Sequence, residues 1–135
     1  MRTMHITLIA GARPNFMKIA PLIKAIKEWK PTSDKVLRTA IGSPIEQSSS
    51  PVKGREEIQY RLVHTGQHYD KNMSDTFFEE LGIPTPDVNL GCGGGSQAEQ
   101  TAAIMVAFEK ELMAHPADIV MVVGDVTSTM ACSIV

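Results

Sequence analysis

The sequence predicts an α/β domain built on an open parallel sheet with helices on both faces. Strand-like and helix-like segments alternate along most of the 135 residues, which is typical of this class. Residues 119–123 are continuously apolar between Asp118 and Gly124, as in a strand that is covered on both faces. With 43% hydrophobic and 21% charged residues, the chain can bury one core of single-domain size.

The first unit is a strand over residues 5–12 followed by a helix over residues 15–29. The strand is β-branched and apolar and ends near Gly11. Pro14 stands at the helix start, where its fixed φ is favourable, whereas Pro21 is expected to be tolerated early in the helix or to kink it. One apolar stripe with spacings of three and four defines the buried face: Phe16, Ile19, Ala20, Ile23 and Ile26.

Residues 30–57 interrupt this pattern with three prolines, a serine run and mixed charges. We expect an inserted flexible loop there, with a short strand at residues 36–41. The alternation resumes with a strand over residues 58–65 and a helix over residues 70–81. Gly82 is well placed to end that helix.

The second half begins with turn residues at 84–90, which predict a short edge strand, and a glycine-rich loop at 91–95. Ser96 and Glu99 match the S-x-x-E capping box that starts many helices. A helix over residues 97–114 follows. Its expected buried residues are Thr101, Met105, Phe108 and Leu112.

Residues 127–135 begin a further apolar helix without a capping residue or a following strand. We therefore expect residues 1–135 to be an N-terminal domain that is incomplete at its C-terminus, within a longer protein. The net charge of −2 provides no electrostatic footprint for nucleic acid or an anionic membrane. Apolar runs are too short for a membrane span or a signal peptide.

Two cysteines, Cys92 and Cys132, provide neither a disulfide framework nor a zinc-binding spacing, and a reduced cytoplasmic location is the simplest interpretation. Ligands of open parallel sheets bind beyond the carboxyl ends of the strands. The loops expected there comprise residues 11–15, 66–70 and 124–129.

Arg13 and Lys18 give the first of these loops an unusual charge. Helix N-termini normally carry acidic residues, yet this one has two cations and no acid. The arrangement favours an anion, which free backbone N–H groups would also attract. The alternative is that both cations are simply solvated. The loop matches neither the dinucleotide-binding glycine pattern nor the P-loop.

The other candidates have structural alternatives. The glycine-rich segment 91–96 could hold a phosphate, but the capping box explains Ser96 and Glu99 equally well. Asp125 follows a buried strand, where desolvation would raise its pKa for acid–base chemistry, or it caps the next helix. His64, Gln67 and His68 suit polar contacts to a sugar or nucleotide better than a metal site, because Gly66 breaks any helical pairing.

Three motifs occur in order: GARPNFMKIAP at residues 11–21, HTGQH at 64–68, and PADIV at 116–120 running into GDVTST at 124–129. Together they closely resemble the bacterial non-hydrolysing UDP-N-acetylglucosamine 2-epimerases. The resemblance implies two Rossmann-like domains that face each other across a cleft, as in GT-B glycosyltransferases. This chain would be most of the N-terminal domain.

The resemblance also implies a reaction. Members of the family interconvert UDP-GlcNAc and UDP-ManNAc by eliminating UDP to a 2-acetamidoglucal and adding it back, without a metal or nicotinamide cofactor. Arg13 and Lys18 match positions that contact the substrate, and Asp125 matches a catalytic acid. Gln67 and His68 match a loop that binds a second, regulatory UDP-GlcNAc in some members. A cytoplasmic homodimer that serves cell-envelope polysaccharide synthesis is implied.

This sequence departs from the commoner family pattern, which has Thr and Glu in place of Ala12 and Asn15. Asp70 and Gly95 or Ser96 replace residues that support the regulatory site, so allosteric activation is not expected. The family's catalytic glutamates and histidine lie beyond Val135, and we expect the chain alone to be inactive. The alternatives are a hydrolysing UDP-sugar epimerase, half of a GT-B glycosyltransferase, or a non-enzymatic flavodoxin-like module.

Overall fold

Four parallel strands form the sheet of the computed structural model, which describes residues 3–29, 57–66, 75–124 and 127–135. The strands are β1 (Thr3–Ala10), β2 (Glu57–His64), β3 (Val88–Asn89) and β4 (Ile119–Val122). Their order across the sheet is β3-β2-β1-β4, and each neighbouring pair is parallel. The predicted open parallel sheet is confirmed, including the short edge strand at β3.

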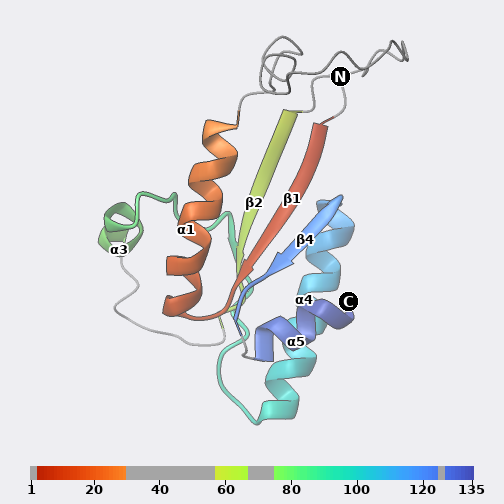
Figure 1. Cartoon of the computed structure of the whole chain (residues 1–135). Helices are drawn as coiled ribbons and strands as arrows, with labels where there is room; N and C mark the ends of the chain where they lie inside the picture. Colours follow the sequence, from red (N-terminus) through yellow and green to blue (C-terminus); the bar gives the residue numbers. More distant parts are fainter. Residues whose placement is uncertain (1–2, 30–56, 67–74, 125–126) are drawn as a thin grey trace, which may run out of the picture.

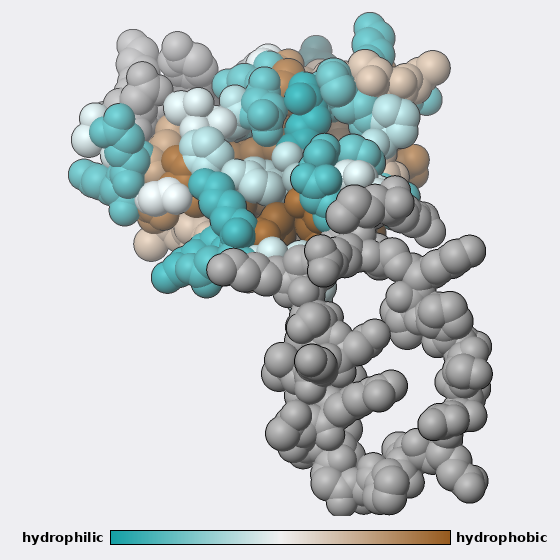
Figure 2. Space-filling view, turned by 90° about the horizontal axis from the view of Figure 1, so that it is seen from above, coloured by the Kyte–Doolittle hydropathy of each residue, from teal (hydrophilic) through white to brown (hydrophobic). Residues whose placement is uncertain are grey.

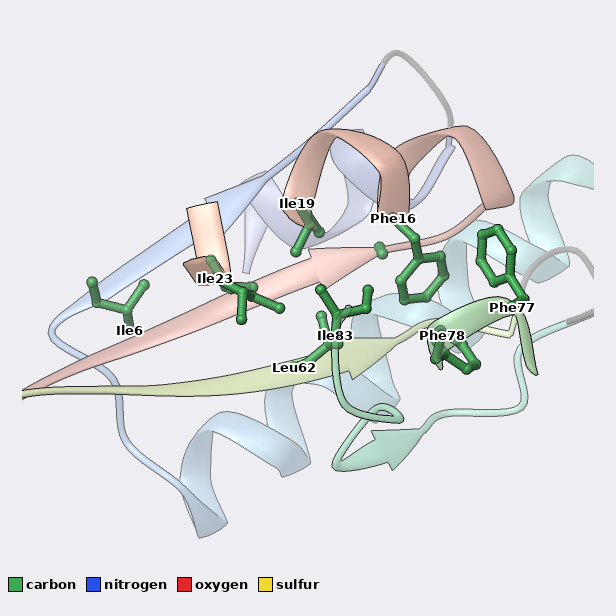
Figure 3. Packing of buried hydrophobic residues seen from close by; sticks show 10 residues of the cluster. Ile6, Phe16, Ile19, Ile23, Leu62, Phe77, Phe78 and Ile83 are labelled. Atoms are coloured by element: carbon green, nitrogen blue, oxygen red, sulfur yellow. The ribbon is translucent and has the colours of Figure 1, made fainter. Parts of the chain in front are cut away.

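Helices cover both faces of the sheet, with α1 (Arg13–Glu28) and α3 (Asp75–Glu80) on one side and α4 (Gln97–Ala114) and α5 (Thr127–Ile134) on the other (Figure 1). A hydrophobic cluster lies under each pair. Figure 3 shows the first cluster, in which α1 inserts Phe16, Ile19 and Ile23 against Leu62 of β2. The second cluster joins Ile9 and Val63 to Ile104 and Phe108 of α4.

The apolar stripe of α1 is confirmed, because Phe16, Ile19 and Ile23 have no exposed surface. The helix continues through Pro21, which lies on its exposed side. In α4 the bounds match the prediction, but the buried face is slightly rotated. Ile104 and Phe108 are fully buried, whereas the predicted Thr101, Met105 and Leu112 are only partly covered.

The prediction that residues 119–123 are covered on both faces is wrong. Ile119 and Val120 are 38% and 37% exposed. Strand β4 stands at the edge of the sheet and pairs only with β1, so one side of its backbone lacks a neighbouring strand among the described residues. The apolar character of this strand therefore exceeds what its described surroundings bury.

The predicted loop with a strand at 36–41, and the first half of the helix predicted over 70–81, lie outside the described residues. The described end of that helix, α3, closes at Gly82 as expected. The Gly82 N–H donates to the Glu79 carbonyl at 2.9 Å and the Ile83 N–H to the Phe78 carbonyl at 3.0 Å. Within the described segments, no helix is both long and apolar enough to cross a membrane.

Replacing Gly82 by alanine should destabilise the fold by about 1 kcal/mol, because the glycine holds a left-handed φ of +65° that a Cβ disfavours. Nothing lies within 4 Å of the added methyl group, so the expected loss comes from the backbone conformation and not from contacts with neighbouring residues. Urea unfolding of Gly82→Ala and of Gly93→Ala, whose φ is not positive, measures the difference. Equal midpoints for the two variants would show that the closing turn is not constrained.

Candidate functional site

The carboxyl ends of β1, β2 and β4 lie together at one end of the sheet, which we call the carboxyl edge. Helices α1 and α5 also begin there (Figure 1). The Thr65 N–H donates to the Ala10 carbonyl at 3.0 Å, which joins the segments that follow β1 and β2. The side-chain amide of Gln97, at the start of α4, donates to the Thr127 hydroxyl. Three helix N-termini therefore gather beside the strand ends.

Most of the buried polar residues of the described chain lie at this edge: Asn15, His64, Thr65, Thr127 and Ser128. We call them the polar cluster. Two glycines allow the cluster to close. A Cβ on Gly11 would collide with the Ser128 hydroxyl oxygen, and one on Gly124 would lie 2.8 Å from Oδ1 of Asn15.

Two atoms of the polar cluster lack hydrogen-bond partners among the described residues, namely Nδ2 of Asn15 and Oγ1 of Thr65. Asn15 is 4% exposed and Thr65 is fully buried. An unsatisfied buried polar atom costs about 1–3 kcal/mol. Such a cost at the place where parallel sheets bind ligands is typical of a functional site, although sequence periodicity did not single out either residue.

Arg13 and Lys18 are both exposed, but only Arg13 lies in the first turn of α1. Because the helix begins at Arg13 and not at residue 15, Lys18 falls in the second turn, and its predicted place at the helix start is wrong. The separation of five residues also places the two cations about 140° apart around the helix axis, so they do not form one pair. Neither cation makes an ion pair within the described part of the chain. Arg61 differs from both of them, because its guanidinium forms an ion pair with Glu111.

The backbone contributes less positive potential to this helix start than the sequence suggested. Pro14 has no N–H group, and the N–H of Asn15 donates to the Ala12 carbonyl at 2.9 Å. Two of the first three residues of α1 therefore offer no backbone donor to a ligand. The first turn contains no acidic residue, so the side-chain charge there comes from Arg13, and Lys18 adds a second cation one turn further along.

The structure reveals one contact of Arg13 that sequence reasoning missed. The guanidinium carbon of Arg13 lies 4.6 Å from the centre of the Phe77 ring, within cation–π range. Phe77 belongs to α3, more than sixty positions along the chain.

His64 is buried in the polar cluster, and its ring packs on Phe16 with centroids 5.2 Å apart. Burial lowers the pKa of its imidazole from the ordinary value of 6.5. Nδ1 accepts a hydrogen bond of 2.8 Å from the Gly66 N–H, so the neutral ring carries its proton on Nε2. His64 therefore shapes the turn after β2 as an acceptor.

The glycine-rich segment at 91–95 leads from β3 into α4, and its helix start is already occupied. Ser96 Oγ accepts from the Glu99 N–H at 3.2 Å, and Glu99 Oε2 accepts from the Ser96 N–H at 2.6 Å. These bonds hold the pKa of the Glu99 carboxyl below its usual range. The capping box is confirmed, and its anionic carboxylate opposes a phosphate at this helix end.

Cys92 and Cys132 are free thiols buried in the second hydrophobic cluster. Burial raises the pKa of both, and for Cys132 burial and the neighbouring Cys92 raise it to about 12. Both therefore remain protonated and unreactive near neutral pH. Within the described segments, no group of three His, Cys, Asp or Glu side chains is placed to hold a metal ion.

Three predicted site residues, Gln67, His68 and Asp125, lie outside the described residues. Only the described residues next to them can be placed. Gln67 follows Gly66 at the end of β2, and Asp125 lies between Gly124 and the start of α5. Both attachment points belong to the same edge as Arg13.

Two surface hollows lie toward the opposite edge of the sheet. One, of about 670 Å³, is lined by Trp29, Tyr60 and Asp87 among others. The second, of about 570 Å³, includes His5 and His115. Figure 2 views the molecule from that side and shows hydrophilic side chains around hydrophobic ones. The candidate site lies at the carboxyl edge, because the cations without an ion pair and the polar atoms without a hydrogen-bond partner, both judged among the described residues, lie there.

Residues 51–135 match the family model described as UDP-N-acetylglucosamine 2-epimerase. The UDP-N-acetylglucosamine 2-epimerase of Methanocaldococcus jannaschii is 31% identical over 98% of this chain. The chain belongs to this epimerase family. The match includes archaeal proteins, so it extends beyond the bacterial members that the motifs indicated.

Two further comparisons agree. The UDP-2,3-diacetamido-2,3-dideoxy-D-glucuronate 2-epimerase of Pseudomonas aeruginosa is 36% identical over 95% of the chain. A crystal structure of the M. jannaschii UDP-GlcNAc 2-epimerase in complex with UDP-GlcNAc and UDP superposes with a TM-score of 0.72 at 30% identity, over 97% of this chain. These structural neighbours confirm the Rossmann-like, GT-B-like fold class. The chain spans 29% of the length of each of these three relatives.

The buried neutral His64 makes the stability of this epimerase-family domain pH-dependent. Because folding lowers the pKa of His64 below 6.5, the unfolded chain binds more protons in the interval between the two pKa values. Stability should be complete above pH 6.5 and should fall as the pH drops toward the folded pKa. Urea unfolding between pH 7.5 and pH 5 measures this slope.

The matched variant is His64→Asn, whose side-chain oxygen can still accept from Gly66 but does not titrate. It should flatten the slope while the other three histidines remain. An unchanged slope in His64→Asn would assign the pH dependence to other groups.

Thr65→Val should stabilise the fold by about 1 kcal/mol, because valine keeps the shape and removes an unsatisfied hydroxyl. Thr101→Val serves as a control, since that hydroxyl donates to the Gln97 carbonyl at 2.7 Å and its removal should bring no gain. Thermal and urea unfolding compare the two. A loss of stability in Thr65→Val would mean that its hydroxyl is bonded in solution.

Proposed function

We propose that this chain supplies the N-terminal Rossmann-like half of a UDP-sugar 2-epimerase. The predicted insertion at residues 30–57 is shortened to residues 30–56, because Glu57 already belongs to β2. Two exposed cations, Arg13 and Lys18, lie in the first two turns of α1 without ion-pair partners among the described residues, and this single observation supports the proposal best. A diphosphate is an extended anion, which fits two cations in successive turns of one helix. The family match and the coverage of 29% of the relatives' length support a role as one part of a larger enzyme.

The proposed reaction interconverts UDP-GlcNAc and UDP-ManNAc. A base removes the proton at C2 of the sugar while the C1–oxygen bond breaks, and the electron pair of that bond leaves with the diphosphate of UDP. Re-addition of UDP and of a proton on the other face of C2 inverts the configuration. Arg13 and Lys18 stabilise the charge that develops on the departing phosphate oxygen. Asp125 serves as an acid–base group, and Gln67 and His68 contact a nucleotide sugar.

A second substrate has support from one relative. The P. aeruginosa protein named UDP-2,3-diacetamido-2,3-dideoxy-D-glucuronate 2-epimerase is more nearly identical to this chain than the M. jannaschii enzyme is. The diphosphate and the 2-acetamido group are common to both sugars, so the same edge would serve either. Assays with both nucleotide sugars decide between them. Release of free UDP without an epimerised product would favour a hydrolase or glycosyltransferase instead.

The remaining parts of the proposal follow the family. The complete enzyme would be a cytoplasmic homodimer in cell-envelope polysaccharide synthesis, with no metal, redox cofactor, nucleic acid or membrane as a partner. The charge balance and the chemistry of the described edge agree with a small anionic ligand.

In the complete enzyme, Arg13→Ala and Asp125→Asn should each lower kcat/KM at least about tenfold, or ~1.4 kcal/mol of transition-state stabilisation. Arg13 would lose the charge that stabilises the leaving UDP, and Asp125 would lose its proton-transfer role. Steady-state epimerisation of the two nucleotide sugars measures both effects.

Lys24→Ala is the matched control, because it removes an exposed lysine from the same helix whose nearest ion-pair partner is Glu28 at 4.0 Å. Its kcat/KM should stay within about twofold of the parent enzyme. Unchanged kcat/KM in both Arg13→Ala and Asp125→Asn would show that the active site does not lie at the carboxyl edge.

A further inference from the structure

Arg13 of α1 contacts an aromatic ring, whereas the other arginine among the described residues, Arg61 of β2, is held by a carboxylate. The Arg13 guanidinium lies 4.6 Å from the Phe77 ring centre, and no ion pair restrains it in the described part of the chain. Arg61, by contrast, pairs with Glu111. The two arrangements have different consequences for an incoming anion.

The Phe77 ring is itself fixed. It is 5% exposed and stands edge-on to Phe16, with centroids 6.4 Å apart and an interplanar angle of 88°. Phe78 packs against it with centroids 5.4 Å apart. Figure 3 shows the three rings together at the end of the sheet where α1 begins. The surface that Arg13 contacts is therefore as rigid as the core.

A carboxylate would also hold Arg13, but it would neutralise the charge and occupy the N–H donors. An aromatic face attracts the cation through its quadrupole and leaves the in-plane N–H groups free to donate to phosphate oxygens. The contact also restricts an otherwise flexible side chain before the ligand arrives, which lowers the entropic cost of binding.

We propose that Phe77 is a positioning residue, which holds the Arg13 guanidinium at the carboxyl edge in the orientation that binds the diphosphate of the nucleotide sugar. This inference rests on the proposed function of Arg13. It assigns to α3, which touches no proposed ligand group itself, a role in setting the geometry of the site.

The test is a double-mutant cycle in the complete enzyme, with kcat/KM for UDP-GlcNAc as the measured quantity. The variants are Phe77→Leu, Arg13→Ala and the double variant. We expect Phe77→Leu to lower kcat/KM about two- to tenfold, the range of a cation–π contact. It should cause no further loss when Arg13 is already alanine, because its effect passes through that residue.

Phe78→Leu is the matched control for a purely structural effect. Phe78 is 6% exposed and lies in the same group of rings, but the structure shows no stacking of Arg13 on it. Its kcat/KM should remain within about twofold of the parent. Phe77→Tyr, which keeps the aromatic face, should restore most of the activity that Phe77→Leu loses.

The proposal would be overturned if Phe77→Leu lowered kcat/KM by the same factor with Arg13 present and with Arg13→Ala. It would also be overturned if Phe78→Leu lowered kcat/KM as much as Phe77→Leu does, or if Phe77→Leu kept full activity. If Arg13→Ala itself leaves kcat/KM unchanged, the proposed function of the site fails instead. NMR of the parent protein adds a readout that needs no variant. The side-chain protons of Arg13 should be shifted upfield by the Phe77 ring current, and ordinary arginine shifts would also overturn the proposal.

Discussion

The close approach of backbone and side chains at Gly11 and Gly124 is the constraint on which the site depends. A side chain at either position would push Ser128 or Asn15 away. The starts of α1 and α5 would then separate, although the sheet itself could still form. Parallel strands bring their carboxyl ends together by topology, but only the missing Cβ atoms allow two helix starts to pack against the same strand ends.

The composition of this edge lowers the stability of the fold. A helix start gains stability from an acidic side chain, as Glu99 provides for α4, yet the first turn of α1 has the cation Arg13 and no acid. Nδ2 of Asn15 and Oγ1 of Thr65 add desolvation costs without partners among the described residues. The large hydrophobic clusters on both faces of the sheet offset these costs. Phe16 and Phe108, which anchor α1 and α4, are the largest of the fully buried side chains.

Local patterns predicted most of the fold. The stripe of α1, the capping box at Ser96 and the turn at Gly82 depend on residues within a few positions of one another, and all three are confirmed. The exposure of β4 was not predictable in this way. An apolar run indicates a strand that could be covered on both faces, but the covering elements belong to distant sequence.

The site was predictable only in part for the same reason. Arg13 and Lys18 stood out because charge at a helix start is a local feature. The ring beneath Arg13 comes from α3, and the burial of Thr65 depends on how segments after two different strands meet. Neither the contact between Arg13 and Phe77 nor the burial of Thr65 follows from the spacing of residues along the sequence.

The aromatic support of Arg13 also explains how one edge can stay cationic without becoming disordered. An arginine without an ion pair at a surface normally samples many rotamers. A carboxylate that restrained it would also neutralise the positive charge that attracts the proposed anionic ligand. Stacking on Phe77 restrains the guanidinium while preserving its charge. The positive potential at the end of β1 is then a fixed property of the fold, set by aromatic packing within the same cluster that anchors α1.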